Sequence, residues 1–278
     1  YDSIDIFGRR RQQLAKEHDQ LSRHWHILRT FVSSQTHDGS VGRSIRFLVR
    51  DKRSHKYLGV ICISGEFLAL KIRNDAIGID DTRWKQVINH SANGSTIIPV
   101  QPFGGKYFGG KLLALLCLSD TVAKAWERRW GDKLVAVSTT NLWASLKSQS
   151  QYDGLEPYWQ KLGVSAGSSP LKPLEPMYQQ MREWMRYNYP YDYWYHFIAK
   201  SNKGMLLQRD NKNRAISFCY KKLGFKAADF RSGHTRGIYF SRLYTNTDAY
   251  FRGEITETEL IPAFDNSVEA LTNYWRFG

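Results

Sequence analysis

The sequence predicts a mixed α/β (α+β) fold. The pattern of its segments indicates this class, and its length shows how large the fold can be. Apolar segments with strand character alternate with helical patterns between residues 44 and 140, and turns rich in glycine or charge separate them. The length of 278 residues is enough for one large domain, or for a domain with a substantial lobe. We expect three parts: an N-terminal helical segment over 1–43, a core over 44–168, and an aromatic-rich part over 169–278 that completes the sheet and adds a tail.

The charge balance indicates an anionic partner. The chain carries 40 lysines and arginines against 26 acidic residues, which gives a formal net charge of +14. Nucleic acid, and DNA in particular, is the first candidate, because a basic surface attracts phosphate groups. A basic surface that is merely solvated is the alternative.

Cysteine spacing and hydropathy argue against a disulfide-rich, a zinc-binding and a membrane-spanning protein. Cys62, Cys117 and Cys219 form no CxxC pair, so a disulfide framework or a zinc site is not expected. Because no cluster of side chains has a convincing metal-ligand pattern, we expect no metal cofactor. The longest apolar run, near Leu112, is too short to span a bilayer, and we expect a cytoplasmic protein with no membrane partner.

The first predicted element is a basic helix over residues 9–30, where apolar residues recur at helical spacing. Its basic face is a candidate to follow a phosphate backbone, and it begins with the run Arg9, Arg10, Arg11. A solvated amphipathic helix is the alternative.

Two strands are predicted next, over 44–50 and 57–64, and the charged turn between them favours an antiparallel hairpin. A helix is expected from Asp80 to about His90, and a loop then leads to a strand at Ile97. The remaining elements are a buried strand over 134–140, a short helix over 157–162 closed by Gly163, a linker over 165–176, a helix over 213–225, a strand over 237–244 and a more acidic tail with some helical character.

The stretch over residues 97–126 has the pattern of a phosphate-binding turn. A β-branched strand leads into a glycine-rich turn, and a leucine-rich helix follows. Glycines let the backbone approach an anion, and the free amides and dipole of a helix start favour negative charge. The cofactor candidates in this turn are Gly104, Gly105, Lys106, Gly109, Gly110 and Lys111. A tight strand-to-helix turn with no ligand is the alternative.

Ser138 and Thr139 are further candidates for cofactor binding. They stand at the C-terminal end of the strand over 134–140, where the sites of open α/β sheets gather. A turn that caps the next segment is the alternative.

A dense aromatic tract over residues 184–197 is a candidate nucleic-acid surface. Rings beside arginines can stack on unpaired bases. The candidates are Arg182, Arg186, Tyr187 and Tyr191. A tyrosine-rich packing core is the alternative.

The glycine turn and a later segment resemble the GNAT acyltransferase fold. In that family the phosphate loop, Arg/Gln-x-x-Gly-x-Gly/Ala, holds the pyrophosphate of acetyl-CoA, and residues 104–113 fit this frame from its second glycine onward. Gly104 stands where the family has Arg or Gln, and Tyr107 where it has the first glycine. Tyr220 to Phe225 resembles the late Y-x-x-x-G-F segment, whose Tyr acts as a general acid. The resemblance implies a mostly antiparallel central sheet flanked by helices, with acetyl-CoA or another acyl-CoA as cofactor.

A second resemblance, to the family named for DruA of the Druantia anti-phage systems, covers residues 21–167. Its fragments occur in family order: Leu21-Ser22-Arg23-His24-Trp25, Arg46-Phe47-Leu48-Val49, Tyr57-Leu58-Gly59, Asp75-Ala76-Ile77-Gly78, Val87-Ile88-Asn89-His90, Ile97-Ile98-Pro99, Trp126 to Gly131 and Tyr158-Trp159 to Gly163. The resemblance implies a divergent GNAT-like core over 44–168 and a part in the conflict between phage and bacterium.

The leading hypothesis is a GNAT-like enzyme that acylates bases of DNA. Lys106 and Lys111 hold the cofactor phosphates in this hypothesis, and the strands that separate after Val100 and around Ser138 bind the pantetheine arm. The catalytic candidates are Tyr220 as acid for the leaving thiolate, and Asp75 or His90 as base for the amine nucleophile. The alternative is a non-catalytic DNA-binding module that keeps the fold and has lost the cofactor.

Overall fold

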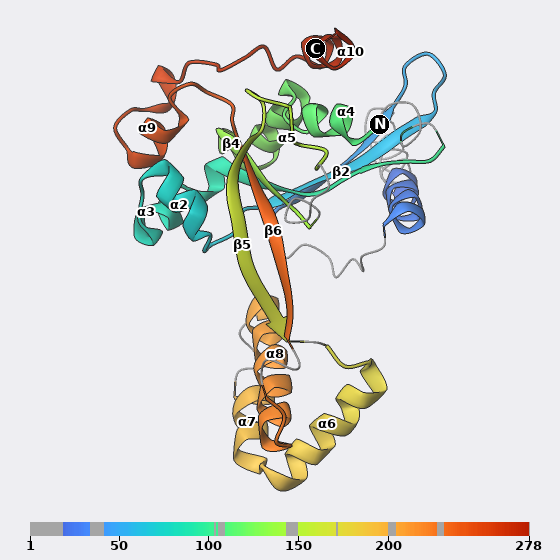
Figure 1. The fold of residues 1–278 in the computed structure, drawn as a ribbon, viewed down its shortest axis with the longest axis vertical. Helices are drawn as coiled ribbons and strands as arrows, with labels where there is room; N and C mark the ends of the chain where they lie inside the picture. Colours follow the sequence, from blue (N-terminus) through green and yellow to red (C-terminus); the bar gives the residue numbers. More distant parts are fainter. Residues whose placement is uncertain are drawn as a thin grey trace, which may run out of the picture. The chain divides into compact units, whose positions relative to one another are not determined.

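A computed structural model describes residues 19–33, 42–102, 104, 109–142, 150–170, 172–199, 204–226 and 231–277. Six strands form one sheet in the order β1-β2-β3-β4-β6-β5, with helices beside it, which confirms the predicted mixed α/β class (Figure 1). The chain divides into two compact units, which we call the first unit (Tyr1–Val164 with Gly237–Gly278) and the second unit (Ser165–Arg236).

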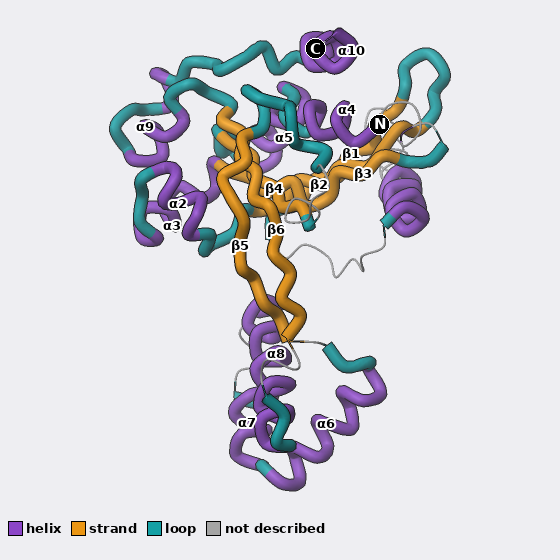
Figure 2. The backbone as a smooth tube through the Cα atoms, viewed as in Figure 1, coloured by secondary structure: helices purple, strands orange, loops and turns teal. Residues whose placement is uncertain are grey.

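The sheet is mostly antiparallel, as expected. Its strands are β1 (Ser44–Arg50), β2 (Tyr57–Gly65), β3 (Ser91–Pro99), β4 (Ala136–Asn141), β5 (Gln160–Pro170) and β6 (Arg231–Arg242). The predicted hairpin of β1 and β2 is confirmed, and β3 continues the antiparallel ladder. β4 is parallel to β3 through three residue pairs and antiparallel to β6. β5 runs beside β6 (Figure 2).

Two strands differ from the sequence prediction. The loop predicted before Ile97 is wrong, since β3 already begins at Ser91 and its polar residues pair with β2 and β4. Ser95 is an extra residue of β3 at a register shift opposite Cys62 and Ile63, as in a β-bulge.

The short helix and the start of the linker after residue 157 are also wrong, because residues 160–170 form β5. Pairing with β6 overrides a composition that is poor in strand-forming residues. Gly163 is therefore a strand residue rather than a helix cap. Its φ of 148° is a backbone conformation that side chains with a Cβ rarely adopt, so the strand favours glycine there.

Helices α4 (Gly109–Leu116), α5 (Asp120–Trp130) and α10 (Val268–Phe277) contribute to the main hydrophobic cluster on one face of the sheet. The cluster joins helix side chains to alternate strand residues, among them Leu113, Trp126, Val137, Tyr239 and Leu271. α5 ends at Gly131, whose φ of 77° gives a left-handed cap.

The opposite face is covered by α2 (Lys71–Ile77), α3 (Asp81–Val87), η1 (Ile88–His90) and α9 (Thr247–Arg252), with η4 (Glu257–Glu259) following. Their cluster contains Ile77, Trp84, Ala136, Phe240 and Phe251. A helix over residues 19–32 packs on the same face farther along, where Trp25 contacts a cluster with Val60, Cys62 and Val100.

The buried tryptophans of the first unit combine apolar packing with one directed hydrogen bond each. Their indole N–H groups donate to backbone carbonyl oxygens: Trp25 to Ile61 at 3.2 Å, Trp84 to Phe67 at 3.0 Å, Trp126 to Asn89 at 3.1 Å and Trp159 to Ala114 at 2.9 Å. Because a buried N–H without an acceptor is costly, these bonds restrict how helix and strand can pack.

The second unit has a small core of its own. Helices α6 (Glu175–Asn188), α7 (Pro190–Phe197) and α8 (Gly204–Lys222) enclose it. The buried residues are Tyr178, Met181, Met185, Ala215, Ile216 and Cys219, and the partly buried rings around them include Tyr189, Tyr193 and Phe197. Only part of the aromatic tract therefore belongs to a packing core.

Candidate functional site

A basic groove of about 1020 Å³ runs along β1, which is one of the two edge strands of the sheet. The helix over 19–32 lines one side of it, and the C-terminal end of α5 lines the other. Four arginines contribute to the lining: Arg43, Arg46, Arg50 and Arg129. We call this feature the arginine groove.

Two of these arginines are held in place by the protein. Arg43 forms an ion pair with Asp132 at 2.5 Å, and its guanidinium lies 5.4 Å from the centre of the Trp130 ring. Arg46 donates to Nε2 of His26 at 2.9 Å and lies 5.1 Å from the Trp25 ring. These contacts fix the positions of the two charges along the groove.

Arg50 and Arg129 are exposed, as Arg46 is, but they differ from it in their polar contacts. Neither the Arg50 nor the Arg129 side chain has an ion pair or hydrogen bond with any residue that the structure describes, although Arg129 lies 5.3 Å from the Trp130 ring. The turn after β1 carries two more exposed cations, Lys52 and Arg53, which do not line the groove itself. Fixed and free cations beside aromatic rings suit a ligand that carries several phosphates.

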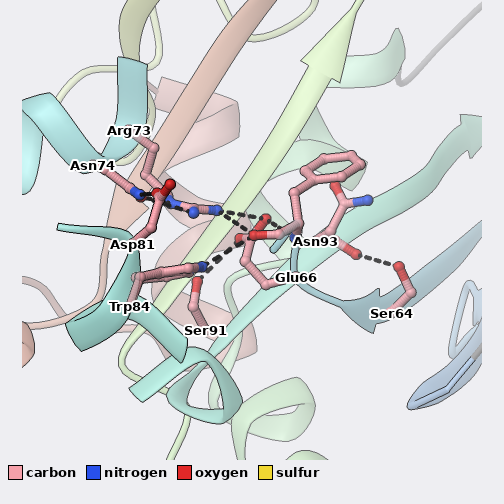
Figure 3. Close-up of polar contacts among 9 residues, drawn as sticks. Ser64, Glu66, Arg73, Asn74, Asp81, Trp84, Ser91 and Asn93 are labelled. Atoms are coloured by element: carbon pink, nitrogen blue, oxygen red, sulfur yellow. Dashed lines mark hydrogen bonds and ion pairs between the residues drawn. The ribbon is translucent and has the colours of Figure 1, made fainter. Parts of the chain in front are cut away.

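A cluster of buried polar side chains lies between α2, α3 and the start of β3 (Figure 3). Glu66 and Arg73 form an ion pair at 3.2 Å in which neither side chain is exposed, and Arg73 stacks 3.6 Å from the centre of the Trp84 ring. Burial lowers the pKa of Arg73 to about 10, and the Glu66 carboxylate opposes that change. Arg73 therefore stays charged near neutral pH.

The polar groups of this cluster satisfy one another. The Glu66 carboxylate accepts from the Phe67 amide at 2.8 Å and from the Ser91 hydroxyl at 3.1 Å. Arg73 donates to the Phe67 carbonyl and to Oδ1 of Asn74, and Asn74 donates to Asp81 at 2.7 Å. The cluster thus joins α2 and α3 to the start of β3, which is a structural role.

The three predicted catalytic residues lie on three different elements. Asp75 is exposed on α2. His90 ends η1, where Nδ1 lies 3.1 Å from the Lys133 carbonyl oxygen and 3.7 Å from the Glu257 carboxylate. Tyr220 belongs to α8 of the second unit, and its ring packs edge-on against Phe225. Their catalytic roles stay predictions.

Two of the predicted cofactor glycines are explained by close packing. The Gly104 amide donates to the Val100 carbonyl at 2.6 Å, and a Cβ there would lie 2.0 Å from the Leu58 carbonyl oxygen. A Cβ at Gly110 would lie 2.0 Å from Oε1 of Gln151. Neither glycine requires a ligand for its presence.

Of the four other predicted residues of the turn, the structure describes two. Gly109 starts α4 with a φ of 65°, and Lys111 is exposed in the first turn of that helix. Gly105 and Lys106 lie outside the described residues.

Ser138 and Thr139 are both buried on β4 and face opposite sides of the sheet. The Thr139 hydroxyl donates to the Gly94 carbonyl oxygen at 2.8 Å, which joins β4 to β3 just beyond the last parallel pair. The Ser138 hydroxyl has no hydrogen-bond partner among the described residues.

The predicted nucleic-acid residues are divided between two parts of the chain. Arg9, Arg10 and Arg11 lie outside the described residues. Arg182 donates to the Tyr193 hydroxyl at 3.3 Å and lies over the Phe197 ring, so it belongs to the core of the second unit. Arg186, Tyr187 and Tyr191 are exposed on α6 and α7.

A model of the family described as Druantia protein DruA matches residues 10–253. The chain belongs to the DruA family. The match confirms the resemblance inferred over 21–167 and extends it, because the whole second unit and β6 lie within the matched residues.

A curated relative is the Druantia protein DruA of Escherichia coli (strain UMEA 4076-1), which is 24% identical over 240 residues. The alignment covers 80% of this chain and 57% of the relative, so the chain spans little more than half the length of that DruA protein. No solved structure matches the chain.

The segment over 150–155 of this DruA-family chain holds polar residues that the sequence patterns did not single out. The Tyr239 hydroxyl donates to the Asp153 carboxylate at 2.6 Å, and Gln151 donates to the Ile97 carbonyl at 3.2 Å. Burial, then the bond to Asp153, raises the pKa of Tyr239 to about 12. The Asp153-Gly154 pair predicts a turn, but no local pattern connects it to β6.

Within the ranges given above, no three or more His, Cys, Asp or Glu side chains are grouped as metal ligands would be. None of the described helices of this DruA-family protein combines the length and the apolar character needed to span a membrane.

Proposed function

We propose that this DruA-family chain takes part in anti-phage defence by binding DNA in the arginine groove. The observation that carries the proposal is the groove itself, in which four arginines line one hollow together with the partly exposed rings of Tyr57 and Trp130. A polyanion with flat bases matches both kinds of lining.

The arginines have complementary tasks in this proposal. Arg43 and Arg46 are already held by Asp132 and His26 as well as by tryptophan rings, so little conformational entropy is lost when a phosphate binds them. Arg50 and Arg129 make no ion pair or hydrogen bond with the described residues, so their charges are available to phosphate groups. Each arginine that neutralises a phosphate releases counterions, which makes the affinity fall as salt rises.

The test compares two charge-matched double variants of the full chain. Arg50→Ala with Arg129→Ala removes the two exposed groove cations. Lys85→Ala with Arg276→Ala removes two exposed cations elsewhere in the first unit. DNA affinity is measured by fluorescence anisotropy between about 50 and 200 mM salt.

We expect the groove variant to bind more weakly and its salt slope to fall by about one for each lost phosphate contact, while the control keeps the wild-type slope. Equal affinities and slopes of the two double variants contradict the groove as the binding site. Absence of any salt-sensitive DNA binding by the wild-type chain contradicts the proposed function altogether.

A second candidate, acyl-CoA-dependent modification of DNA bases, is favoured by the geometry of β3 and β4. Their parallel pairing ends after Asn93 and Ser138, and β3 leads through a glycine turn into α4. The GNAT resemblance assigns such separating strands to the pantetheine arm. Gln151 lies against Gly110 and bonds to Ile97, so acyl-CoA binding requires this side chain to move.

Thermal protection separates this candidate from simple DNA binding. A ligand at 100 times its Kd stabilises the folded state by about 2.7 kcal/mol, which raises Tm measurably. We test acetyl-CoA at millimolar concentration, followed by mass spectrometry of nucleosides from treated DNA. An unchanged Tm and unmodified nucleosides remove the acyltransferase candidate and leave the DNA-binding proposal intact.

A further inference from the structure

Helix α7 of the second unit carries aromatic side chains on two sides. Tyr193 and Phe197 point toward the unit's core, where they pack with Arg182 and with one another. Tyr191 and Trp194, three residues apart, are 72% and 48% exposed. We call these two exposed residues the ring face.

Rings at this spacing ordinarily cover a hydrophobic core. The core of the second unit is already closed by the other side of α7, with Met185 and Ile216 fully buried. The ring face therefore adds nothing to that core. Large apolar side chains that stay exposed together indicate a binding surface.

The charge of the second unit restricts the partner. Its 72 residues, 165–236, hold thirteen lysines and arginines against five aspartates and glutamates. This unit therefore carries a surplus of eight positive charges out of the +14 of the whole chain. A partner that offers both flat apolar faces and dense negative charge fits such a surface, and nucleic acid has both.

Single-stranded and duplex nucleic acids differ in whether a protein can reach the faces of the bases or only their edges. In a duplex the faces of the bases are stacked on one another, and a protein meets only their edges. In a single strand the faces are free to stack on side chains. The Tyr191 and Trp194 rings lie 6.2 Å apart with their planes inclined by 34°, and the exposure of both side chains leaves ring surface that a base can reach.

We propose that the ring face stacks unpaired bases, so that this protein prefers single-stranded to duplex nucleic acid. The inference rests on the proposed function, because nucleic acid is its partner, but it uses a surface of the second unit that is separate from the arginine groove.

The experiment measures binding of the full chain to a fluorescent thymine 20-mer and to a 20-base-pair duplex at one salt concentration. Tyr191→Ala with Trp194→Ala removes both rings of the ring face. Leu174→Ala with Phe277→Ala removes two apolar side chains that are 82% and 85% exposed elsewhere. Thermal unfolding confirms that both double variants fold like the wild type.

We expect the wild type to bind the single strand more tightly than the duplex. The ring-face variant loses about tenfold in single-strand affinity for each stacked base, and its duplex affinity is unchanged. Tyr191→Phe keeps the affinity, because a phenyl ring still stacks. The control variant behaves as wild type.

Three results overturn the inference. One is equal affinity of the wild type for single strand and duplex, and another is wild-type single-strand affinity in the ring-face variant. The third is a wild-type dimer, seen by analytical ultracentrifugation, that dissociates in the ring-face variant, which assigns the face to a second copy of the chain. In each case DNA binding that depends on Arg50 and Arg129 can persist, so the groove proposal stands or falls separately.

Discussion

Glu66 and Arg73 form an ion pair of 3.2 Å that is closed off from solvent on all sides. Arg73 also lies flat against Trp84, and the pair ties α2 and α3 to the first residue of β3 through Ser91. One buried pair of charges therefore contributes, beside the apolar cluster of Ile77 and Trp84, to the position of two helices on the sheet.

Removing one member of this pair is expected to destabilise the first unit. Arg73→Met leaves the Glu66 carboxylate buried without its counterion, and such losses cost about 3–5 kcal/mol. The free energy of unfolding in urea gives the value. The double variant Glu66→Leu with Arg73→Met is expected to lose less than Arg73→Met alone, because no uncompensated charge remains. Additive losses contradict this account.

Tyr239→Phe tests the bond between β6 and the 150–155 segment. A hydrogen bond to a charged group contributes about 1.5–3 kcal/mol, so we expect a loss of that size at pH 7. The pKa of Tyr239 is raised to about 12, above the unfolded value of about 10. Its contribution is therefore complete below pH 10 and is lost as the pH rises toward 12.

The difference in stability between wild type and Tyr239→Phe should accordingly shrink above pH 10. Unfolding curves measured from pH 8 to 11 follow it, with the exposed Tyr187→Phe as the control. A difference that stays constant across this range would mean that Tyr239 does not titrate as stated.

Gly104→Ala should destabilise the turn before α4. The new Cβ would lie 2.0 Å from the Leu58 carbonyl oxygen, which is backbone and cannot turn away. We expect a loss of about 1–3 kcal/mol from overpacking. At Gly65 the nearest atoms to a new Cβ are 4.0 Å away, so Gly65→Ala serves as the control and is expected to fold normally. Equal stabilities would show that close packing does not explain the glycine.

Arg43→Ala and Arg50→Ala should affect stability differently although both line the arginine groove. Arg43 pairs with Asp132 and lies over Trp126 and Trp130, so its loss is expected to cost about 1–2 kcal/mol. Arg50 has no such contacts among the described residues, and its loss should change stability by less than about 0.5 kcal/mol. Thermal unfolding of the two variants measures both effects.

Local patterns predicted the elements that have a strong local cause. The hairpin of β1 and β2 follows from two apolar runs around a charged turn, and the start of α3 follows from Asp80, which caps that helix. β5 has no such signal, because its only reason to be a strand is the neighbouring β6. The start of β3 likewise has no local strand signal and is a strand because it pairs with β2 and β4.

The residues of the candidate site are brought together only by the tertiary fold, so local sequence patterns could not predict it. Arg43, Arg46 and Arg129 come from a loop, a strand and a helix, and no spacing in the sequence relates them. Among the tyrosines of the aromatic tract, Tyr193 is packed and Tyr191 is exposed, although they are two residues apart. Packing decides between them, and a single sequence does not contain that information.

The chain enters the second unit along β5 and returns to the first unit along β6, and these two strands are neighbours in the sheet. Residues 165–236 are thus an insertion whose entry and exit lie on one strand pair. Helices α6, α7 and α8 belong wholly to this insertion, whereas β1 to β4 lie outside it. A change in those helices therefore leaves the pairing of β1 to β4 as it is.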